Sequence, residues 1–160
     1  MIILIMGVTG AGKTTMGRAL AESLHWRFVD ADDYHSPANV AKMHAGIALT
    51  DEDRAPWLQS LRAAILGWLA AGEHIVLACS ALKASYRDIL VVSPHVKLVY
   101  LQISEELAAT RLAARHGHYM NPTLLRSQFE TLQEPRDALT IDANQPTEHL
   151  VANIRRRIGV

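Results

Sequence analysis

The stretch Ile2-Ile-Leu-Ile-Met-Gly-Val-Thr-Gly-Ala-Gly-Lys-Thr-Thr15 decides the fold of this chain. Residues 2–6 are apolar and mostly β-branched, and a glycine follows them. Such a run predicts a strand that is buried on both faces. Gly7-x-x-x-x-Gly12-Lys13-Thr14 follows directly and is the complete pattern of a phosphate-binding loop. A helical pattern comes next, so the loop has both neighbours that the motif requires.

The loop suits the phosphates of a nucleotide. Its glycines let the backbone curl, so that N–H groups and the N-terminus of the next helix face an oligophosphate. We expect Lys13 to act in catalysis at the β and γ phosphates of ATP, and the Thr14 hydroxyl to bind Mg²⁺. The predicted nucleotide contacts are Gly7, Val8, Thr9, Gly10, Ala11, Gly12, Lys13, Thr14 and Thr15. The alternative interpretation is a glycine-rich turn without a ligand.

Composition narrows the class of protein. The chain has 160 residues, 49% of them hydrophobic and 20% charged, which fits one globular domain with a real core. Sixteen basic residues balance sixteen acidic ones, so nothing favours nucleic acid or an anionic membrane surface, and no apolar run approaches a membrane span. Met1 is followed directly by the predicted strand, without a secretory pattern. The single cysteine, Cys79, fits a reducing cytoplasm.

Strand and helix patterns alternate along the whole chain. We expect strands at 2–6, 26–30, 74–79, 96–101 and 139–142. This alternation predicts a three-layer α/β/α fold around a five-stranded parallel sheet, in one domain spanning 1–160. Residues 36–72 read as two helices between the second and third strands, more than a simple crossover needs. They are interpreted as a helical substrate-binding insertion.

Two carboxylates follow the second strand. Asp30 and Asp32 are two residues apart, so at a strand end their side chains are expected on the same side. Ligands bind beyond the carboxyl ends of strands in open α/β sheets, where the phosphate loop also lies. The pair therefore predicts a general base together with a carboxylate that supports Mg²⁺ through water. The alternative is an acidic loop that caps the next helix.

Pairs of cations one helical turn apart occur twice. Lys83 and Arg87 open the helix after the third strand, and Arg111 and Arg115 end the helix after the fourth. The second pair leads into residues 116–122, a Gly- and Pro-containing segment that suits a lid closing over phosphates. The alternative for both pairs is solvated charge on a helix face or end.

The sequence closely resembles the small gluconokinases, within the shikimate-kinase and nucleoside-monophosphate-kinase group. The resemblance covers nearly the whole chain. The motifs that carry it are the phosphate loop, Asp30-Ala-Asp32-x-x-His35, Asn39-x-x-Lys42-Met43-x-x-Gly46, Leu49-Thr-Asp51-x-Asp53-Arg54-x-Pro56-Trp57-Leu58, Cys79-Ser-Ala-Leu-Lys83-x-x-Tyr86-Arg87-Asp88, Arg111-Leu-x-x-Arg115-x-Gly117-His118 and Ser127-Gln-Phe-x-Thr-Leu-x-Glu134-Pro135.

The resemblance implies ATP-dependent phosphorylation of the 6-hydroxyl of D-gluconate by a homodimer. Asp32 would accept the hydroxyl proton, while Asp30 supports Mg²⁺ through water. The expected substrate contacts are Asp32, His35, Arg54, Lys83 and Arg87, the last three being candidates for the carboxylate. Arg111 and Arg115 would close over the phosphates and the adenine, Arg115 also serving catalysis. The rival interpretations are a nucleotide or shikimate kinase, and a nucleotide-binding regulatory module without turnover.

Overall fold

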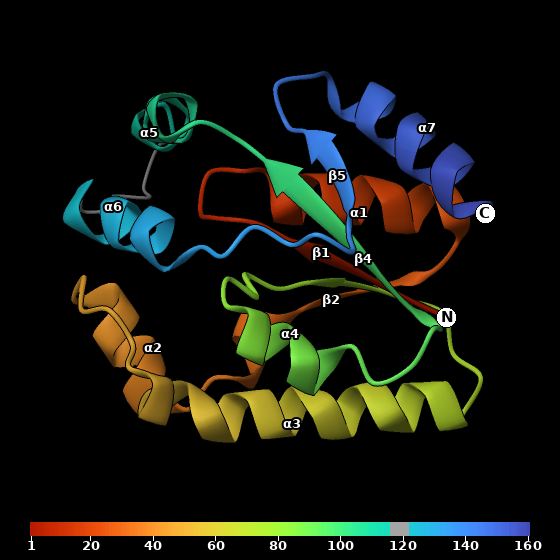
Figure 1. The fold of residues 1–160 in the computed structure, drawn as a ribbon, viewed down its shortest axis with the longest axis horizontal. Coiled ribbons are helices and arrows are strands. Elements are labelled where there is room, and N and C mark those ends of the chain that lie inside the picture. The colour runs from red at the N-terminus through yellow and green to blue at the C-terminus, as the bar shows by residue number, and fades with distance from the viewer. Residues whose placement is uncertain (116–121) are drawn as a thin grey trace.

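A five-stranded parallel sheet forms the centre of the molecule (Figure 1). The computed structural model describes residues 1–115 and 122–160. The strands are β1 (Ile2–Met6), β2 (Arg27–Asp30), β3 (Ile75–Ala78), β4 (Val96–Gln102) and β5 (Leu139–Asp142), in the spatial order β2-β3-β1-β4-β5. Every residue of β1 is buried, as the apolar run at the start of the chain predicts.

Helices cover both faces of this sheet, and this confirms the predicted three-layer α/β/α fold. Alternate residues of β1 point to opposite faces: Ile3 and Ile5 belong to one buried cluster, Ile2 and Leu4 to the other. The helices are α1 (Lys13–Leu24), α2 (Pro37–His44), α3 (Asp51–Ala70), α4 (Ala84–Leu90), α5 (Glu105–Ala113), α6 (Pro122–Thr131) and α7 (Thr147–Ile158). Figure 1 shows α1 and α7 on one side of the sheet and α3 and α4 on the other.

The predicted helical insertion has two different parts. The α3 helix buries Trp57, Leu58, Leu61 and Ile65 in the cluster under β1 and β3, so it forms a layer of the fold itself. The α2 helix keeps only Asn39 fully buried and lies at one end of the molecule, beside the carboxyl ends of β2 and β3. Within 36–72, α2, the loop after it and the first turns of α3 therefore lie towards the carboxyl ends of the strands, where Met43, Leu49 and Arg54 line one cleft.

Side-chain caps fix where these helices begin. The Ser36 hydroxyl accepts from the Asn39 N–H, and Ser104 caps α5 in the same way through Leu107. Thr50 and Asp53 form the predicted capping box at the start of α3. These caps orient the first turns of α2 and α3, which face the carboxyl ends of the strands.

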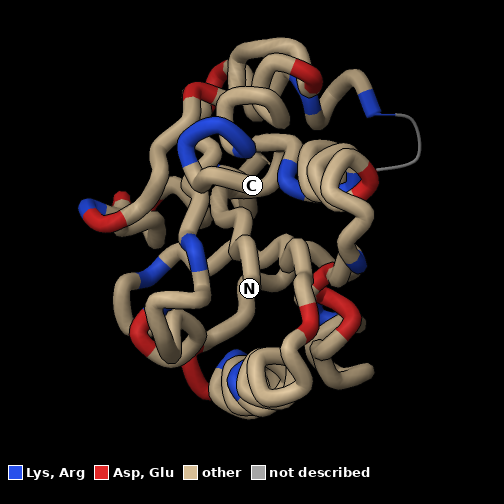
Figure 2. Tube along the Cα trace, turned by 90° about the vertical axis from the view of Figure 1, so that its right-hand side faces the viewer, with Lys and Arg blue, Asp and Glu red and all other residues tan. Residues whose placement is uncertain are grey.

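The charges are mixed over the molecule rather than collected in one stripe. Figure 2 shows basic and acidic positions interspersed along the side that carries both termini. Among the described residues, no helix combines the length and the apolar character that crossing a membrane requires.

Candidate active site

The phosphate loop connects β1 to α1 in the tight curve that the sequence predicts. Gly10 and Gly12 have φ angles of 82° and 91°, a left-handed conformation that disfavours other residues. A Cβ atom on Gly10 would also lie only 2.9 Å from the Ala108 carbonyl oxygen of α5. The loop is therefore held closely between the sheet and α5, with the N-terminus of α1 opening onto it.

Lys13 is the first residue of α1, and its side chain folds back over the loop. Its Nζ donates to the Val8 carbonyl oxygen at 2.9 Å. Burial lowers the pKa of Lys13, whereas the negative charges of Asp32 and Asp30 oppose that shift. The ammonium group is thus poorly solvated, and the neighbouring carboxylates favour its charged form, which is the form that can bind a phosphate.

Asp30 and Asp32 reach the site by a different local structure from the one predicted. The strand β2 ends at Asp30, and residues Ala31–Tyr34 form a 3-10 turn, so strand alternation does not align the two side chains. Instead the Asp30 Oδ1 atom accepts from the Asp32 N–H at 3.0 Å and caps the turn. Both carboxylates nevertheless line the same cleft.

The two carboxylates differ in their surroundings. The pKa of Asp32 is raised by partial desolvation in the cleft and then by the charge of Asp30, while Lys13 opposes the rise. Asp30 instead accepts at Oδ2 from the Thr14 hydroxyl, at 3.4 Å. A raised pKa favours proton uptake by Asp32, and Asp30 is the carboxylate beside the loop hydroxyl.

Thr14 and Asp30 together fit a magnesium ion. Mg²⁺ is usually held by one or two protein oxygens, by water and by phosphate oxygens rather than by a full protein cage. A hydroxyl and a carboxylate lie side by side here, next to the phosphate loop. No group of three or more metal-binding His, Cys, Asp or Glu side chains occurs in ranges 1–115 and 122–160, so the nucleotide would supply the remaining ligands.

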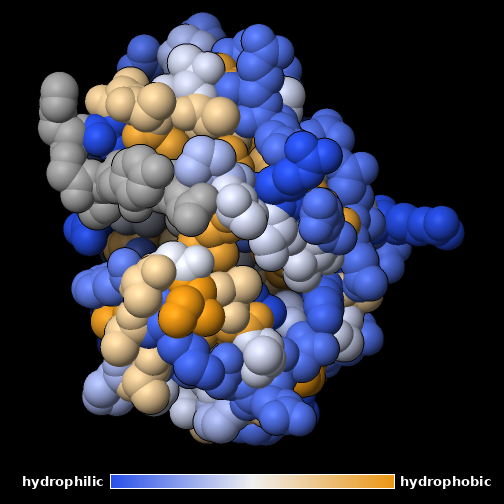
Figure 3. All heavy atoms as spheres, turned by 90° about the vertical axis from the view of Figure 1, so that its left-hand side faces the viewer, coloured by the Kyte–Doolittle hydropathy of each residue, from blue (hydrophilic) through white to orange (hydrophobic). Residues whose placement is uncertain are grey.

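The cleft has a volume of about 360 Å³ and extends from the phosphate loop towards α2, α3 and α6. His35 stacks on Trp57, with ring centroids 4.3 Å apart, and the indole Nε1 donates to the Ala31 carbonyl oxygen at 2.7 Å. Arg54 lines the same wall. Figure 3 looks onto the end of the molecule that carries α2 and α6, and it shows hydrophobic surface on both sides of the hollow between its upper and lower parts.

Arg54 takes part in a series of hydrogen bonds that connects the cleft with polar groups outside it. Its Nη1 atom donates to the Tyr86 hydroxyl at 3.1 Å, and that hydroxyl donates in turn to the Asp51 carboxylate. Lys83 Nζ donates to both oxygens of Asp51, at 2.8 and 2.9 Å. Lys83 is therefore engaged by an acid and does not line the cleft, unlike the arrangement expected for a substrate contact.

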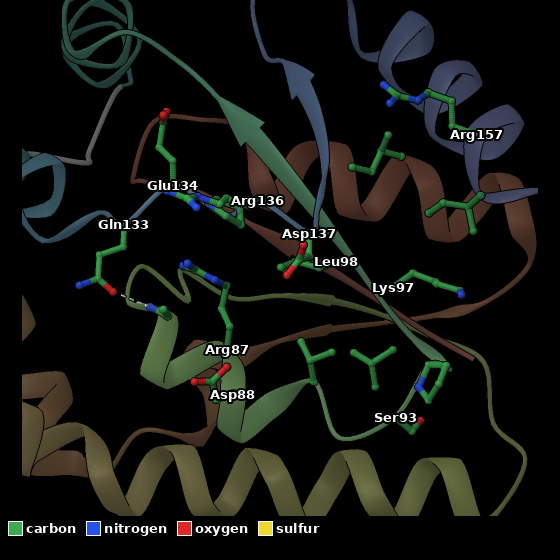
Figure 4. A pocket seen from close by; sticks show the side chains of 17 residues that line it. Arg87, Asp88, Ser93, Lys97, Leu98, Gln133, Glu134, Arg136, Asp137 and Arg157 are labelled. Atoms are coloured by element: carbon green, nitrogen blue, oxygen red, sulfur yellow. Dashed lines mark hydrogen bonds between the residues drawn. The ribbon is translucent and has the colours of Figure 1, made fainter.

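Arg87 is not brought to the cleft, and its predicted role as a substrate contact is corrected here. It lies inside α4 rather than at its start, only 8% of its surface is exposed, and its Nη1 donates to the Ala81 and Leu82 carbonyl oxygens at 2.9 and 3.0 Å. Figure 4 shows the separate cavity of about 1100 Å³ that it lines, together with Glu134 and Arg136. Lys83 is the N-cap of α4 and has extended backbone angles, φ −92° and ψ 145°, so the spacing of four residues does not place its side chain on the same helix face as Arg87.

Arg111 and Arg115 lie on the other side of the phosphate loop. They line a cavity of about 300 Å³ between the loop, α5 and the start of α7, and Arg115 also borders the main cleft. Arg111 Nη2 donates to the Ala143 carbonyl oxygen at 2.8 Å, which ties α5 to the loop after β5. This cavity has the position expected for the base and ribose of a nucleotide whose phosphates occupy the loop. The predicted lid, 116–122, lies outside the described residues except for Pro122.

Gln128 is a site residue that sequence reasoning did not single out. It lies on α6, and its Oε1 atom accepts from the Thr9 N–H of the phosphate loop at 2.8 Å. Gln128 also lines the cleft. Its only signal in the sequence is membership of the motif Ser127-Gln-Phe-x-Thr-Leu, which gives no indication of a contact with a residue 119 positions away.

A phosphate loop that shares a small cleft with carboxylates is the arrangement with which P-loop kinases phosphorylate small molecules. The fold and the site thus define a P-loop phosphotransferase. The model of the shikimate kinase family matches residues 9–156. At the level of single proteins, the chain belongs to the gluconokinase family within that group, as its similarity to individual relatives shows.

Three relatives carry this assignment. A probable gluconokinase of Mus musculus is 44% identical over 152 residues, covering 84% of this chain and 83% of the relative. The thermoresistant gluconokinase of Escherichia coli K12 is 40% identical, covering 95% and 90%. The crystal structure of a gluconokinase from Sinorhizobium meliloti 1021 matches with a TM-score of 0.83 and 40% identity, covering 98% and 94%.

Proposed function

We propose that the protein transfers the γ-phosphoryl group of ATP to the 6-hydroxyl of D-gluconate, giving 6-phospho-D-gluconate and ADP. The observation that carries this proposal is the main cleft, which places the Lys13 ammonium, the Asp32 carboxylate and the Arg54 guanidinium around one volume of about 360 Å³. A sugar acid needs these three functions: a phosphate donor site, a base for its hydroxyl and a cation for its carboxylate. The names of the relatives support the same substrate.

The nucleotide would lie across the phosphate loop. The loop amides and Lys13 would hold its phosphates, Arg111 and Arg115 would border the adenosine half, and Thr14 with Asp30 would hold Mg²⁺. When bound, the metal ion neutralises charge that builds up between the β and γ phosphates. Lys13 would exchange its hydrogen bond to the Val8 carbonyl oxygen for a contact with the phosphates and neutralise part of the same charge.

The acceptor would lie between Asp32 and Arg54. As the gluconate 6-oxygen forms its bond to the γ phosphorus, the bond from that phosphorus to the oxygen bridging to the β phosphate breaks, and ADP leaves. Asp32 takes the proton of the hydroxyl, and its raised pKa favours this role. Arg54 would grip the carboxylate at the other end of the acceptor, where His35 and Trp57 form the wall.

The test is a panel of acceptors with ATP and a continuous assay of ADP release. We expect turnover with gluconate, and at least roughly 10³-fold lower kcat/KM with glucose, because glucose leaves the Arg54 charge unpaired. Comparable kcat/KM for glucose and gluconate would overturn the carboxylate contact. Faster turnover with shikimate or a nucleoside monophosphate would make the protein a kinase of that other class. ATP binding without ADP release on any acceptor would favour a regulatory module.

The proposal includes three properties of the whole enzyme: use of Mg²⁺, assembly as a homodimer and a cytoplasmic location. Thr14 beside Asp30 supports the first. The second rests on resemblance to the gluconokinases alone. A cytoplasmic location is supported by the need for ATP and by the free, buried thiol of Cys79. Sedimentation equilibrium of the purified protein would test the dimer.

A further inference from the structure

The orientation of the Arg54 side chain towards the cleft requires a structural explanation. An arginine side chain has many rotamers, and holding one of them costs entropy that weakens any contact it makes. Arg54 is half-buried in the first turn of α3. Its Nη1 atom donates to the Tyr86 hydroxyl at 3.1 Å, and its Cζ atom lies 5.6 Å from the centroid of the Tyr86 ring. One tyrosine from α4 thus contacts the guanidinium through both its hydroxyl and its ring.

The Tyr86 hydroxyl has one proton, and its neighbours decide where that proton points. Asp51 is an ionised carboxylate that only accepts, whereas the Arg54 guanidinium only donates. The hydroxyl therefore donates to Asp51 and presents its lone pairs to Arg54. Lys83 fixes Asp51 from the other side through two hydrogen bonds. Both hydrogen bonds are therefore donated in the same direction, from Arg54 to Tyr86 and from Tyr86 to Asp51.

The fold fixes the positions of Tyr86 and Asp51. Tyr86 is only 6% exposed and belongs to the cluster under the sheet, so its hydroxyl has a fixed position. Asp51 is the first residue of α3 and lies three residues before Arg54, on the same side of the helix. An acid at a helix N-terminus is also favoured by the helix dipole. Asp51 and Arg54, the two ends of this series of hydrogen bonds, therefore belong to the same capped first turn of α3.

We propose that Tyr86 is a positioning residue for the acceptor: with Asp51 and Lys83 behind it, its hydroxyl orients the Arg54 guanidinium so that this group selects acceptors carrying a carboxylate. This inference rests on the proposed function, because it needs Arg54 to bind the acid. It replaces direct substrate contact by Lys83 with an indirect role, in which Lys83 holds the Asp51 carboxylate.

The first test is Tyr86→Phe, which removes the hydroxyl and keeps the buried ring. We expect KM for gluconate to rise about 3- to 10-fold, the effect of one lost hydrogen bond, with kcat and KM for ATP changing less than about 2-fold. The matched control is Tyr100→Phe, since Tyr100 is also buried and its hydroxyl donates to Glu134 at 2.9 Å, away from the cleft. This control should leave KM for gluconate unchanged.

The second test is a double-mutant cycle with Arg54→Ala. If Tyr86 acts through Arg54, adding Tyr86→Phe to Arg54→Ala will not raise KM for gluconate further. Additive effects, an unchanged KM in Tyr86→Phe, or an equal change in Tyr100→Phe would each overturn the inference. These outcomes differ from failure of the proposed function, in which the unmodified protein itself would not phosphorylate gluconate.

Discussion

Replacing Arg54 by alanine tests where the acid group of the acceptor binds. The guanidinium lies on the cleft wall and, among the described residues, donates a hydrogen bond to the Tyr86 hydroxyl. A charge-assisted contact with a carboxylate contributes about 1.5–3 kcal/mol, and at about 1.36 kcal/mol per factor of ten this predicts a 10- to 150-fold fall in kcat/KM for gluconate.

Initial rates with varied gluconate at saturating ATP, and the reverse, provide the measurement. KM for ATP should stay within about 2-fold, because Arg54 does not line the cavity beside Arg111. The loss of a single half-buried hydrogen bond should lower Tm by less than about 4 °C. Equal losses for ATP and gluconate would refute the reasoning and place Arg54 on the phosphates.

Arg87→Ala is the contrasting variant. It strips two buried carbonyl oxygens of their charged donor, so we expect Tm to fall by about 5–15 °C. The remaining folded enzyme, assayed well below that Tm, should keep its KM for gluconate within about 2-fold. A selective loss of gluconate binding with little change in Tm would restore Arg87 as a substrate contact.

Three further predictions concern the charges around the cleft. Lys13→Ala should abolish turnover while circular dichroism and Tm report an intact fold, and unchanged activity would remove the phosphate loop from the mechanism. Asp32→Asn should lower kcat by roughly 10²- to 10⁴-fold with ATP binding retained, and a larger loss of kcat in Asp30→Asn would exchange the two roles. The third is a pH dependence of stability: the Thr50 N–H and then Lys42 lower the pKa of Asp53 to about 2. Because this carboxyl has a lower pKa in the folded than in the unfolded chain, its contribution is present above about pH 4 and is lost as the pH falls towards 2. The difference in Tm between the unmodified protein and Asp53→Asn should therefore shrink over that interval, and a constant difference would contradict it.

Local sequence rules predicted most of the fold. The apolar runs gave all five strands within one or two residues, and Ser36, Thr50 and Ser104 cap helices as expected, because strand burial and helix caps depend on residues close in the chain. The glycines of the phosphate loop likewise have the left-handed angles that its pattern requires. Asp30 and Asp32 do line one cleft, but a 3-10 turn rather than strand alternation brings them there.

The substrate side of the site was less predictable, because it is built from contacts between distant segments. Arg54, Lys83 and Arg87 look equivalent in the sequence, as cations within recognisable motifs. Tertiary packing separates them: one lines the cleft, one pairs with Asp51, and one supports buried carbonyl groups. Gln128 was missed for the same reason, since its contact with the phosphate loop depends on where α6 packs.

Phosphorylation of gluconate on its 6-hydroxyl is tested most directly by the ³¹P nuclear magnetic resonance spectrum of the product formed from ATP, Mg²⁺ and gluconate. Phosphate on the 6-hydroxyl is bonded through oxygen to a CH₂ group, so we predict a new signal split by two protons, growing in step with ADP. A signal split by a single proton would place the phosphate on a secondary hydroxyl and contradict the orientation between Asp32 and Arg54. Release of inorganic phosphate alone would contradict transfer to the sugar acid altogether.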